Sequence, residues 1–285
     1  MGDLIQKPTS SSFQCDTPSI SRHTDRLPII QVENLEVTYG EETILRGVSF
    51  EVYAGEVMAV LGRSGCGKST LFKAMVGLVD NVGGKVYIDG ELVKPISQGG
   101  TERILRKVGV LFQSGALFSS MTVAENVAFP LRKFTNLSER NIEQIVNMKL
   151  SQVGMIGKEQ YLPSELSGGM QKRVALARAM ALDPKILFFD EPSAGLDPVT
   201  SAELDLTIRH ITEALNTTIV IVSHELASIF SVASRAIMLD AEEKGIIAIG
   251  TPEELKQNCA DSRVQQFFGR SITSGKGTQE HYKNF

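Results

Sequence analysis

The feature that most constrains the fold of this chain is a glycine-rich octapeptide from Gly62 to Ser69, with the sequence Gly-Arg-Ser-Gly-Cys-Gly-Lys-Ser. It matches the pattern G-x-x-x-x-G-K-[ST], directly after the apolar run from Val57 to Leu61 and before a predicted helix. Glycines let successive backbone N–H groups converge on phosphate oxygens, and the start of a helix adds its positive end. We therefore expect a strand, a phosphate-binding loop and a helix within an α/β domain. The alternative, an ordinary glycine-rich turn, is disfavoured by the flanking strand and helix.

Two side chains of this loop have chemistry suited to a nucleotide. The Lys68 ammonium supplies a positive charge for the β- and γ-phosphates, and the Ser69 hydroxyl is a hard oxygen ligand suited to Mg²⁺. The residues expected to contact the nucleotide here are Gly62, Arg63, Ser64, Gly65, Cys66, Gly67, Lys68, Ser69 and Thr70.

The composition excludes several classes of protein. The chain has 285 residues, of which 42% are hydrophobic, so it is long enough to bury a core and differs from a disordered protein. Its net charge of −4 gives no general attraction to nucleic acid. No apolar run approaches the roughly 18 residues needed to cross a bilayer, so any connection to a membrane is expected to run through a partner. The three cysteines lack the spacing of a zinc site.

Short β-branched runs alternate with helical patterns along most of the chain. Strands are expected at residues 29–39, 43–52, 56–61, 85–88, 108–112, 186–189, 218–222, 236–239 and 246–249, and helices at 67–77, 164–182, 199–215 and 224–232. This alternation predicts a parallel sheet covered on both faces and interrupted by an α-helical insertion. Residues 114–168 are expected to form an α-helical insertion. The domain is expected to span 28–268, between a flexible arm at 1–27 and a polar tail at 269–285.

A second motif places two carboxylates at the end of a predicted strand. The apolar run from Ile186 to Phe189 is followed by Asp190 and Glu191. Ligands gather at the carboxyl ends of strands in open α/β sheets. We expect Asp190 to hold Mg²⁺ opposite Ser69, and Glu191 to polarise the water that attacks the γ-phosphate. The alternative is that both acids only cap the turn that follows.

Between these two motifs stands the pentapeptide Leu166-Ser167-Gly168-Gly169-Met170, followed by a helical pattern. Here the chain resembles the ATP-binding cassette (ABC) family, over about residues 29–250. The resemblance implies an α/β fold with a P-loop NTPase core containing a mixed sheet, an antiparallel β subdomain and an inserted α-helical subdomain at about 114–168. It also implies ATP hydrolysis by a dimer of two copies. Ser167, Gly168 and Gly169 of each copy would meet the γ-phosphate held by the other.

The resemblance implies roles for four further residues. Tyr39 resembles the aromatic residue that stacks on adenine, although it could be an ordinary strand tyrosine. Gln113 resembles the glutamine that touches Mg²⁺ and water and joins the core to the helical subdomain. His224 resembles the histidine that contacts the γ-phosphate, although a lone histidine is usually structural. Asp197 resembles the residue that communicates across the dimer.

The expected site residues fall into three groups. The catalytic residues are Glu191, His224, Gln113 and Lys68; the metal ligands are Ser69, Gln113 and Asp190; and the remaining nucleotide contacts are Tyr39, Ser167, Gly168, Gly169 and Asp197, together with the loop from Gly62 to Thr70. The expected cofactors are ATP and Mg²⁺.

Two departures from the commonest family pattern indicate a branch. Met170 stands where Gln is usual, and the five residues from Ser193 to Asp197 replace a shorter form. With the segment from Asn126 to Leu131, they resemble the lipid-transport branch that works with Mce-domain proteins, as in the Mla phospholipid systems. This implies an integral membrane permease and an Mce-domain lipid-binding protein as partners, with no nucleic acid, on the cytoplasmic face of the inner (plasma) membrane. Transport of another small substrate is the alternative.

Two other classes of ABC protein fit less well. Those that act on ribosomes or DNA usually carry two cassettes or a long coiled-coil insertion, and neither stands between Lys68 and Leu166. A regulatory module without catalysis would be expected to lose Lys68, Glu191 or His224, and all three are present.

A soluble ATPase can move a lipid only by acting on a protein in the bilayer, so a docking groove is expected just after Gln113. We predict that Ala116, Leu117, Phe118 and Met121 line this groove, because an apolar cluster beside a nucleotide sensor is poorly placed for solvent. The alternative is that they form the core of the helical subdomain.

Overall fold

The computed structural model describes residues 27–80, 82–99 and 102–273. The strands are β1 (Pro28–Tyr39), β2 (Glu42–Tyr53), β3 (Val57–Gly62), β4 (Val82–Ile88), β5 (Glu91–Leu92), β6 (Val108–Leu111), β7 (Ile186–Asp190), β8 (Thr218–Val222), β9 (Arg235–Asp240) and β10 (Gly245–Gly250). The helices are α1 (Lys68–Met75), α2 (Glu102–Leu105), α3 (Val123–Phe134), α4 (Glu139–Gln152), α5 (Gly168–Ala179), α6 (Pro198–Leu215), α7 (Leu226–Val232), α8 (Pro252–Asn258) and α9 (Ser262–Thr273), with single 3-10 turns η1 (Ile96–Gln98) and η2 (Pro163–Glu165). The predicted arm, apart from Leu27, and the predicted tail from residue 274 lie outside the described residues.

The centre of the molecule is a six-stranded mixed sheet in the order β10-β9-β3-β8-β7-β6. Strands β9, β3, β8, β7 and β6 run parallel, and β10 pairs antiparallel with β9. Every residue of β3, β7 and β8 is buried, as expected for strands covered on both faces. Their alternate side chains enter two separate cores, for example Ala59 in one and Val60 in the other.

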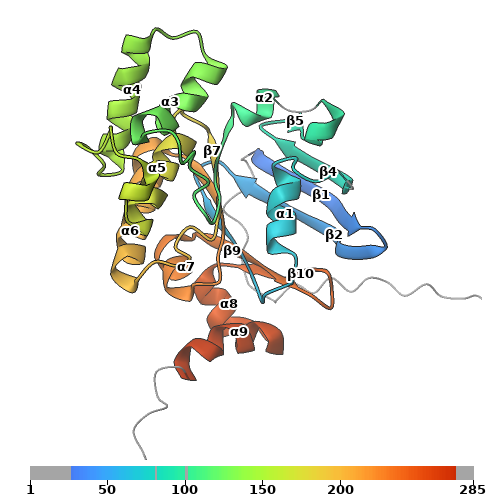
Figure 1. Ribbon diagram of the computed structural model, residues 1–285. Helices are drawn as coiled ribbons and strands as arrows, with labels where there is room; N and C mark the ends of the chain where they lie inside the picture. Colours follow the sequence, from blue (N-terminus) through green and yellow to red (C-terminus); the bar gives the residue numbers. More distant parts are fainter. Residues whose placement is uncertain (1–26, 81, 100–101, 274–285) are drawn as a thin grey trace, which may run out of the picture.

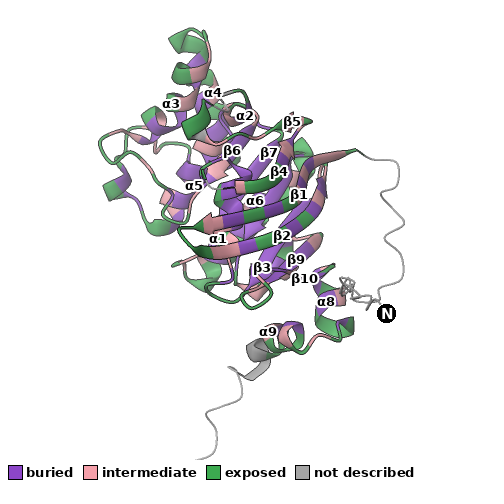
Figure 2. Ribbon diagram, turned by 90° about the vertical axis from the view of Figure 1, so that its right-hand side faces the viewer, coloured by how far each residue is buried: buried purple, intermediate pink, exposed green. Residues whose placement is uncertain are grey.

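Both faces of the central sheet are covered, as predicted, but by different layers. Helices α5, α6 and α7 contribute to one core, whereas the other is shared with α1 and a four-stranded antiparallel sheet in the order β2-β1-β4-β5. Strands β1 and β2 form a long hairpin in which buried and exposed residues alternate (Figure 2). A strand with only one apolar face cannot sit inside a sheet buried on both sides, so these strands build a layer of their own.

The helical insertion stands at one end of the sheet, where α3 and α4 project away from it (Figure 1). Helix α3 begins with a capping box between Thr122 and Glu125, and Ser138 caps α4 through its hydroxyl. The buried face of both helices joins the core that contains α5. This arrangement connects the insertion to the sheet through α5. Within the described ranges, none of the helices is both long enough and apolar enough to span a bilayer.

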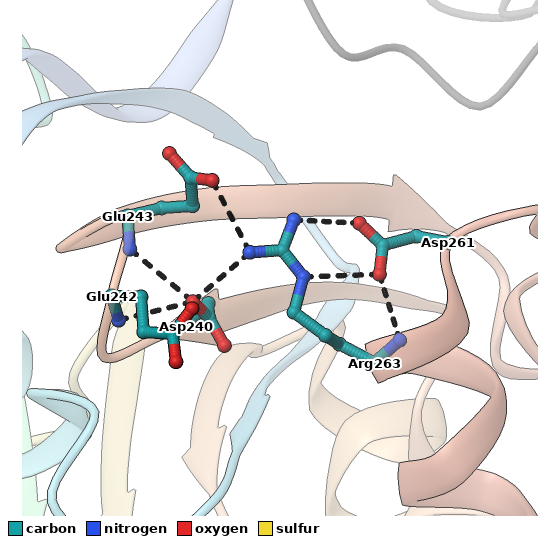
Figure 3. A network of polar contacts seen from close by, with 5 residues as sticks. All are labelled: Asp240, Glu242, Glu243, Asp261 and Arg263. Atoms are coloured by element: carbon teal, nitrogen blue, oxygen red, sulfur yellow. Dashed lines mark hydrogen bonds and ion pairs between the residues drawn. The ribbon is translucent and has the colours of Figure 1, made fainter.

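Helices α8 and α9 close the C-terminal side of the described chain and were not predicted. Arg263 joins them to the β9–β10 turn, since its guanidinium contacts Asp240, Glu243 and Asp261 (Figure 3). Its hydrogen bonds lower the pKa of the Asp261 carboxyl. Helix α9 continues to Thr273 and so overlaps the start of the predicted tail, whose boundary stays a prediction.

Candidate nucleotide site and family

The strand order brings most of the predicted site residues to one edge of the sheet. Strands β3, β8, β7 and β6 are parallel neighbours, so their carboxyl ends lie side by side. Asp190 pairs with Val222, and Val222 pairs with Val60, which lies two residues before Gly62. The glycine-rich loop, the two acids, His224 and Gln113 all lie at or just after these strand ends. This is the edge at which open α/β sheets bind ligands.

The loop from Gly62 to Ser69 has a backbone that depends on glycine. Gly62 has φ 144°, and a Cβ there would lie 2.4 Å from Cys66 Sγ and 2.5 Å from the Leu239 carbonyl oxygen. Gly67, with φ 96°, is the N-cap of α1. Lys68 Nζ donates to the carbonyl oxygens of Gly62 and Arg63 at 2.8 and 3.0 Å, so the ammonium lies over the loop. The loop thus combines backbone donors with a positive charge, which fits a polyphosphate.

Asp190 has the properties of a metal ligand. The residue is 9% exposed, and its Oδ1 atom is buried without a hydrogen-bond partner in the described structure. Burial and the neighbouring charge of Glu191 raise the pKa of Asp190, while Lys73, Lys68 and Lys172 oppose the rise. An unpartnered buried carboxylate oxygen is costly unless a ligand completes it. The donor set of Asp190 and the Ser69 hydroxyl therefore fits a hard cation such as Mg²⁺.

Glu191 is held in a restrained turn immediately after β7. It has φ 49°, which is uncommon for a residue other than glycine, and its N–H donates to the Val222 carbonyl oxygen at 2.8 Å. Its Oε1 lies 2.8 Å from Nδ1 of His224, while the His224 side chain is 68% exposed. The structure therefore brings the predicted base and the predicted γ-phosphate contact together, with the imidazole open to a ligand.

Gln113 begins a loop that two polar side chains, from α5 and α3, hold in place. Its own side chain is exposed. Arg178 on α5 donates to the carbonyl oxygens of Gly115 and Ala116, both at 2.8 Å. Asn126 on α3, which has no exposed surface, bonds both the N–H and the carbonyl oxygen of Phe118. Neither Arg178 nor Asn126 was predicted to have this role. The loop after Gln113 is thus fixed between α3 and α5.

Ser167, Gly168 and Gly169 form a separate group with Asp197. The Ser167 hydroxyl accepts from the Met170 N–H at 3.3 Å and caps α5. A Cβ on Gly169 would lie 2.3 Å from Thr200 Cγ2, and Thr200 Oγ1 donates to Asp197 at 2.6 Å. In the described residues no hydrogen bond or ion pair joins Ser167, Gly168 or Gly169 to Lys68 or Glu191. Within the described chain these residues therefore form a group apart from Lys68 and Glu191.

Tyr39 lies at the tip of the β1–β2 hairpin and is 49% exposed. The same hairpin reaches the phosphate loop, because a Cβ on Gly67 would contact the side chains of Ile44 and Leu45. An exposed aromatic ring at this tip can stack on a base.

The predicted groove residues divide into exposed and packed side chains. Phe118 is 40% exposed and its ring centroid lies 4.8 Å from that of Phe129, which is 39% exposed and was not predicted. Leu117 instead packs against the core of the helical side. The exposed apolar surface here is therefore the Phe118–Phe129 pair, with Ala116 beside it.

Helices α6 and α7, which follow Asp197 and His224, are joined by a buried polar contact. Ser228 Oγ donates to Asp205 Oδ1 at 2.6 Å, and Asp205 is 5% exposed. Burial raises the pKa of Asp205, although the bond from Ser228 opposes this.

The raised pKa of Asp205 predicts a pH effect on stability. The pKa of Asp205 is higher in the folded protein than the unfolded value of about 3.9. Asp205 therefore contributes stability to the folded state at pH values below about 3.9, and this stability is lost as the pH rises through the folded pKa. Asp205→Asn removes this titration and keeps an oxygen to accept from Ser228. We expect the melting temperature of Asp205→Asn to fall less than that of the parent between pH of about 4 and 8. If the melting temperatures of the two proteins, measured in nucleotide-free buffer, changed with pH by the same amount, this prediction would be contradicted.

The family follows from a comparison with known proteins. The family model described as ABC transporter matches residues 45–194. The chain belongs to the ABC transporter family. A Haemophilus influenzae protein named as the intermembrane phospholipid transport system ATP-binding protein MlaF is 42% identical over 84% of this chain and 89% of its own length. The Escherichia coli K12 protein of the same name is 39% identical over 84% and 88%.

Other ABC proteins are similar as well. A Mycobacterium leprae protein named as a probable ribonucleotide transport ATP-binding protein, mkl, is 41% identical over 87% of this chain and 72% of its own length. Among solved structures, cbiO1 from Clostridium perfringens, part of the complex cbiONQ, gives a TM-score of 0.73 at 29% identity, covering 87% of this chain and 96% of that one. The dimeric cassette MJ0796 bound to ADP and Pi gives 0.68 at 27% identity, covering 78% and 98%.

These comparisons confirm the fold class and the biochemical class expected from the motifs. The chain is an ATP-binding, ATP-hydrolysing subunit of an ABC transporter, with the mixed sheet, antiparallel sheet and helical insertion of that family. ABC ATPases work as dimers with a membrane permease.

Proposed function

We propose that this ATPase drives the movement of phospholipid between membranes, through a permease in the inner membrane and an Mce-domain lipid-binding protein, from the cytoplasmic face. The observation that carries this proposal is the 42% identity to an MlaF protein over 84% of this chain and 89% of the relative. Such coverage includes the helical insertion, which is the part of an ABC ATPase expected to meet its permease.

The proposed reaction is hydrolysis of the γ-phosphate by in-line attack of water. Glu191 orients and polarises the water, His224 contacts the γ-phosphate, and Lys68 with the loop from Gly62 to Thr70 binds the phosphates. Tyr39 stacks on the adenine. Because Glu191 Oε1 and His224 Nδ1 are 2.8 Å apart, both side chains can address the same phosphoryl group.

Mg²⁺ is proposed to be held by Ser69, Gln113 and Asp190, and when bound it neutralises charge on the phosphates. Within the described residues, no group of three or more His, Cys, Asp or Glu side chains forms a metal site by itself. Phosphate oxygens and water would therefore complete the coordination, as is usual for Mg²⁺.

The active form is proposed to be a dimer in which each copy completes the site of the other. The half-site at Ser167, Gly168 and Gly169 presents a helix N-terminus and a hydroxyl, which suit an anion. Supporting this, the similar cassette MJ0796 is dimeric with ADP and Pi bound. Asp197 caps α6 beside this half-site and is proposed to sense the partner's nucleotide.

The Phe118–Phe129 pair is proposed as the docking surface for a permease helix. Phe118→Asp is expected to abolish stimulation of ATP hydrolysis by the permease and to leave nucleotide binding unchanged, because a charge opposes burial of the apolar surface. Phe118 is a cleaner position for this test than Leu117, which packs against the core. The measurement is ATPase activity with and without the permease.

A matched control is Leu92→Asp, because Leu92 is 43% exposed and lies on β5 in the antiparallel sheet. This variant should keep its stimulation. Parent-like stimulation of Phe118→Asp would contradict docking at this surface.

The substrate is tested by purifying the complete transporter and identifying what it carries. Phospholipid bound in the complex, together with ATP-dependent transfer of labelled phospholipid between vesicles, is the expected result. The 41% identity to mkl, named for ribonucleotide transport, makes nucleotide transport the second candidate. ATP-dependent uptake of labelled ribonucleotide without lipid transfer would favour it.

A further inference from the structure

Helix α5 carries a lysine that is buried at the nucleotide edge of the sheet. Lys172 stands five residues after Ser167 and is 6% exposed. Its Nζ donates to the carbonyl oxygen of Gln113 and lies 3.5 Å from the carbonyl oxygen of Glu191. Lysine is rarely buried to this extent unless its charge is compensated. A buried ammonium that faces two backbone carbonyls of the candidate site therefore calls for an explanation.

Burial and two nearby negative charges act on Lys172 in opposite directions. Burial lowers the pKa of Lys172, whereas the negative charges of Asp190 and Glu191 oppose this. Lys172 in turn opposes the rise in the pKa of Asp190. Lys172 and the two acids thus form one charge cluster, in which the lysine contacts main-chain atoms and leaves the carboxylates available to a ligand.

The two carbonyls that Lys172 contacts belong to segments with different tasks. The Gln113 carbonyl begins the loop that leads to Phe118, and Arg178 on the same helix holds that loop at Gly115 and Ala116. The Glu191 carbonyl belongs to the peptide that follows β7, in a turn with φ 49°. A shift of the loop relative to α5 must therefore act on Lys172, and a shift of Lys172 acts on the peptide of Glu191.

We propose that Lys172 is a positioning residue that couples the loop after Gln113 to the peptide of Glu191, so that permease docking alters the placement of the catalytic carboxylate. The inference rests on the proposed function, because it takes Glu191 as the residue that orients water and Phe118 as part of the docking surface. Lys172 does not contact the nucleotide in this scheme. Its removal is expected to affect the rate of hydrolysis and its stimulation, with little effect on nucleotide affinity.

The test uses Lys172→Met in the purified ATPase–permease complex. We expect kcat for ATP hydrolysis to fall at least about tenfold, with KM for ATP changed by less than about threefold, since only the arrangement of the reacting groups is altered. Stimulation by the permease should be lost. Lys172→Arg, which keeps the charge and several donors, should recover a large part of both.

Lys149→Met is the matched control. Lys149 on α4 is 1% exposed and pairs with Asp183 rather than with the nucleotide edge. The Lys149→Met variant measures the effect of removing a buried lysine elsewhere in the fold. Equal losses of kcat and melting temperature in both variants would overturn the proposal, as would a parent-like kcat and stimulation in a folded Lys172→Met protein.

Lys172→Gln keeps a donor without the charge and provides the second variant if Lys172→Met does not fold. The same selective loss of kcat in Lys172→Gln supports the proposal, and parent-like kcat overturns it.

Glu191→Gln and Phe118→Asp are measured alongside. If Glu191→Gln hydrolyses ATP like the parent, the proposed catalytic role of Glu191 fails. If Glu191→Gln is inactive while Lys172→Met and Lys172→Gln are parent-like, only the role of Lys172 fails.

Discussion

Glu191→Gln is expected to bind ATP with an affinity close to that of the parent and to hydrolyse it roughly a hundredfold to ten-thousandfold more slowly. The amide has nearly the same size as the carboxyl group, so the turn after β7 and the contact with His224 can persist. It carries no negative charge, so it cannot polarise the attacking water in the same way. The measurement is kcat under saturating ATP, with nucleotide binding determined separately.

The control for this change is Glu225→Gln. Glu225 follows His224 directly, and its carboxylate accepts a hydrogen bond from Ser201 on α6. Its variant should keep most of the activity. A rate like that of the parent in Glu191→Gln would remove Glu191 from its proposed role and leave the chemistry without a base.

Gly169→Ala is expected to lower hydrolysis by roughly a hundredfold while each copy still binds ATP. The added Cβ would lie 2.3 Å from Thr200 Cγ2, on a branched side chain whose hydroxyl is bonded to Asp197. The start of α5 and the start of α6 must therefore move apart, and a displacement of about 1 Å in a catalytic arrangement can cost this much in rate. The phosphate loop follows strand β3, so ATP binding by this loop should be unaffected.

A second substitution separates this steric effect from other causes. Thr200→Ser removes the Cγ2 methyl group and keeps the hydroxyl that bonds Asp197, so Gly169→Ala with Thr200→Ser should regain much of the lost rate. Gly168→Ala should have a smaller effect than Gly169→Ala, because its Cβ would meet only Leu196 at 3.7 Å. Full activity in Gly169→Ala, or failure of Thr200→Ser to restore it, would contradict the packing argument.

The parallel core could be predicted from the sequence because its strands carry a strong local signal. The β-branched run at 218–222 is a strand with the predicted bounds, and the strand before the glycine-rich loop was predicted to within a residue. The two acids and His224 follow parallel strands directly, so their meeting at one edge also follows from the sequence pattern. The roles assigned to these residues stay predictions until activity is measured.

Other features depend on tertiary packing that a local pattern does not contain. Nothing in the sequence around Lys172 distinguishes it from a surface lysine, because its burial results from α5 lying against the ends of β6 and β7. The exposure of Phe129 likewise depends on how α3 is oriented. By contrast, the start of α8 does have a signal, since Thr251, Pro252 and Glu254 form a capping box with proline in the first turn.

The most direct test of the whole account is the structure and mass of Glu191→Gln with Mg²⁺ and ATP. The account predicts a dimer in which Ser167 of each copy lies within hydrogen-bond distance of the γ-phosphate bound by Lys68 of the other copy. A complex that stays monomeric with ATP bound, with Ser167 remote from any phosphate, would contradict it.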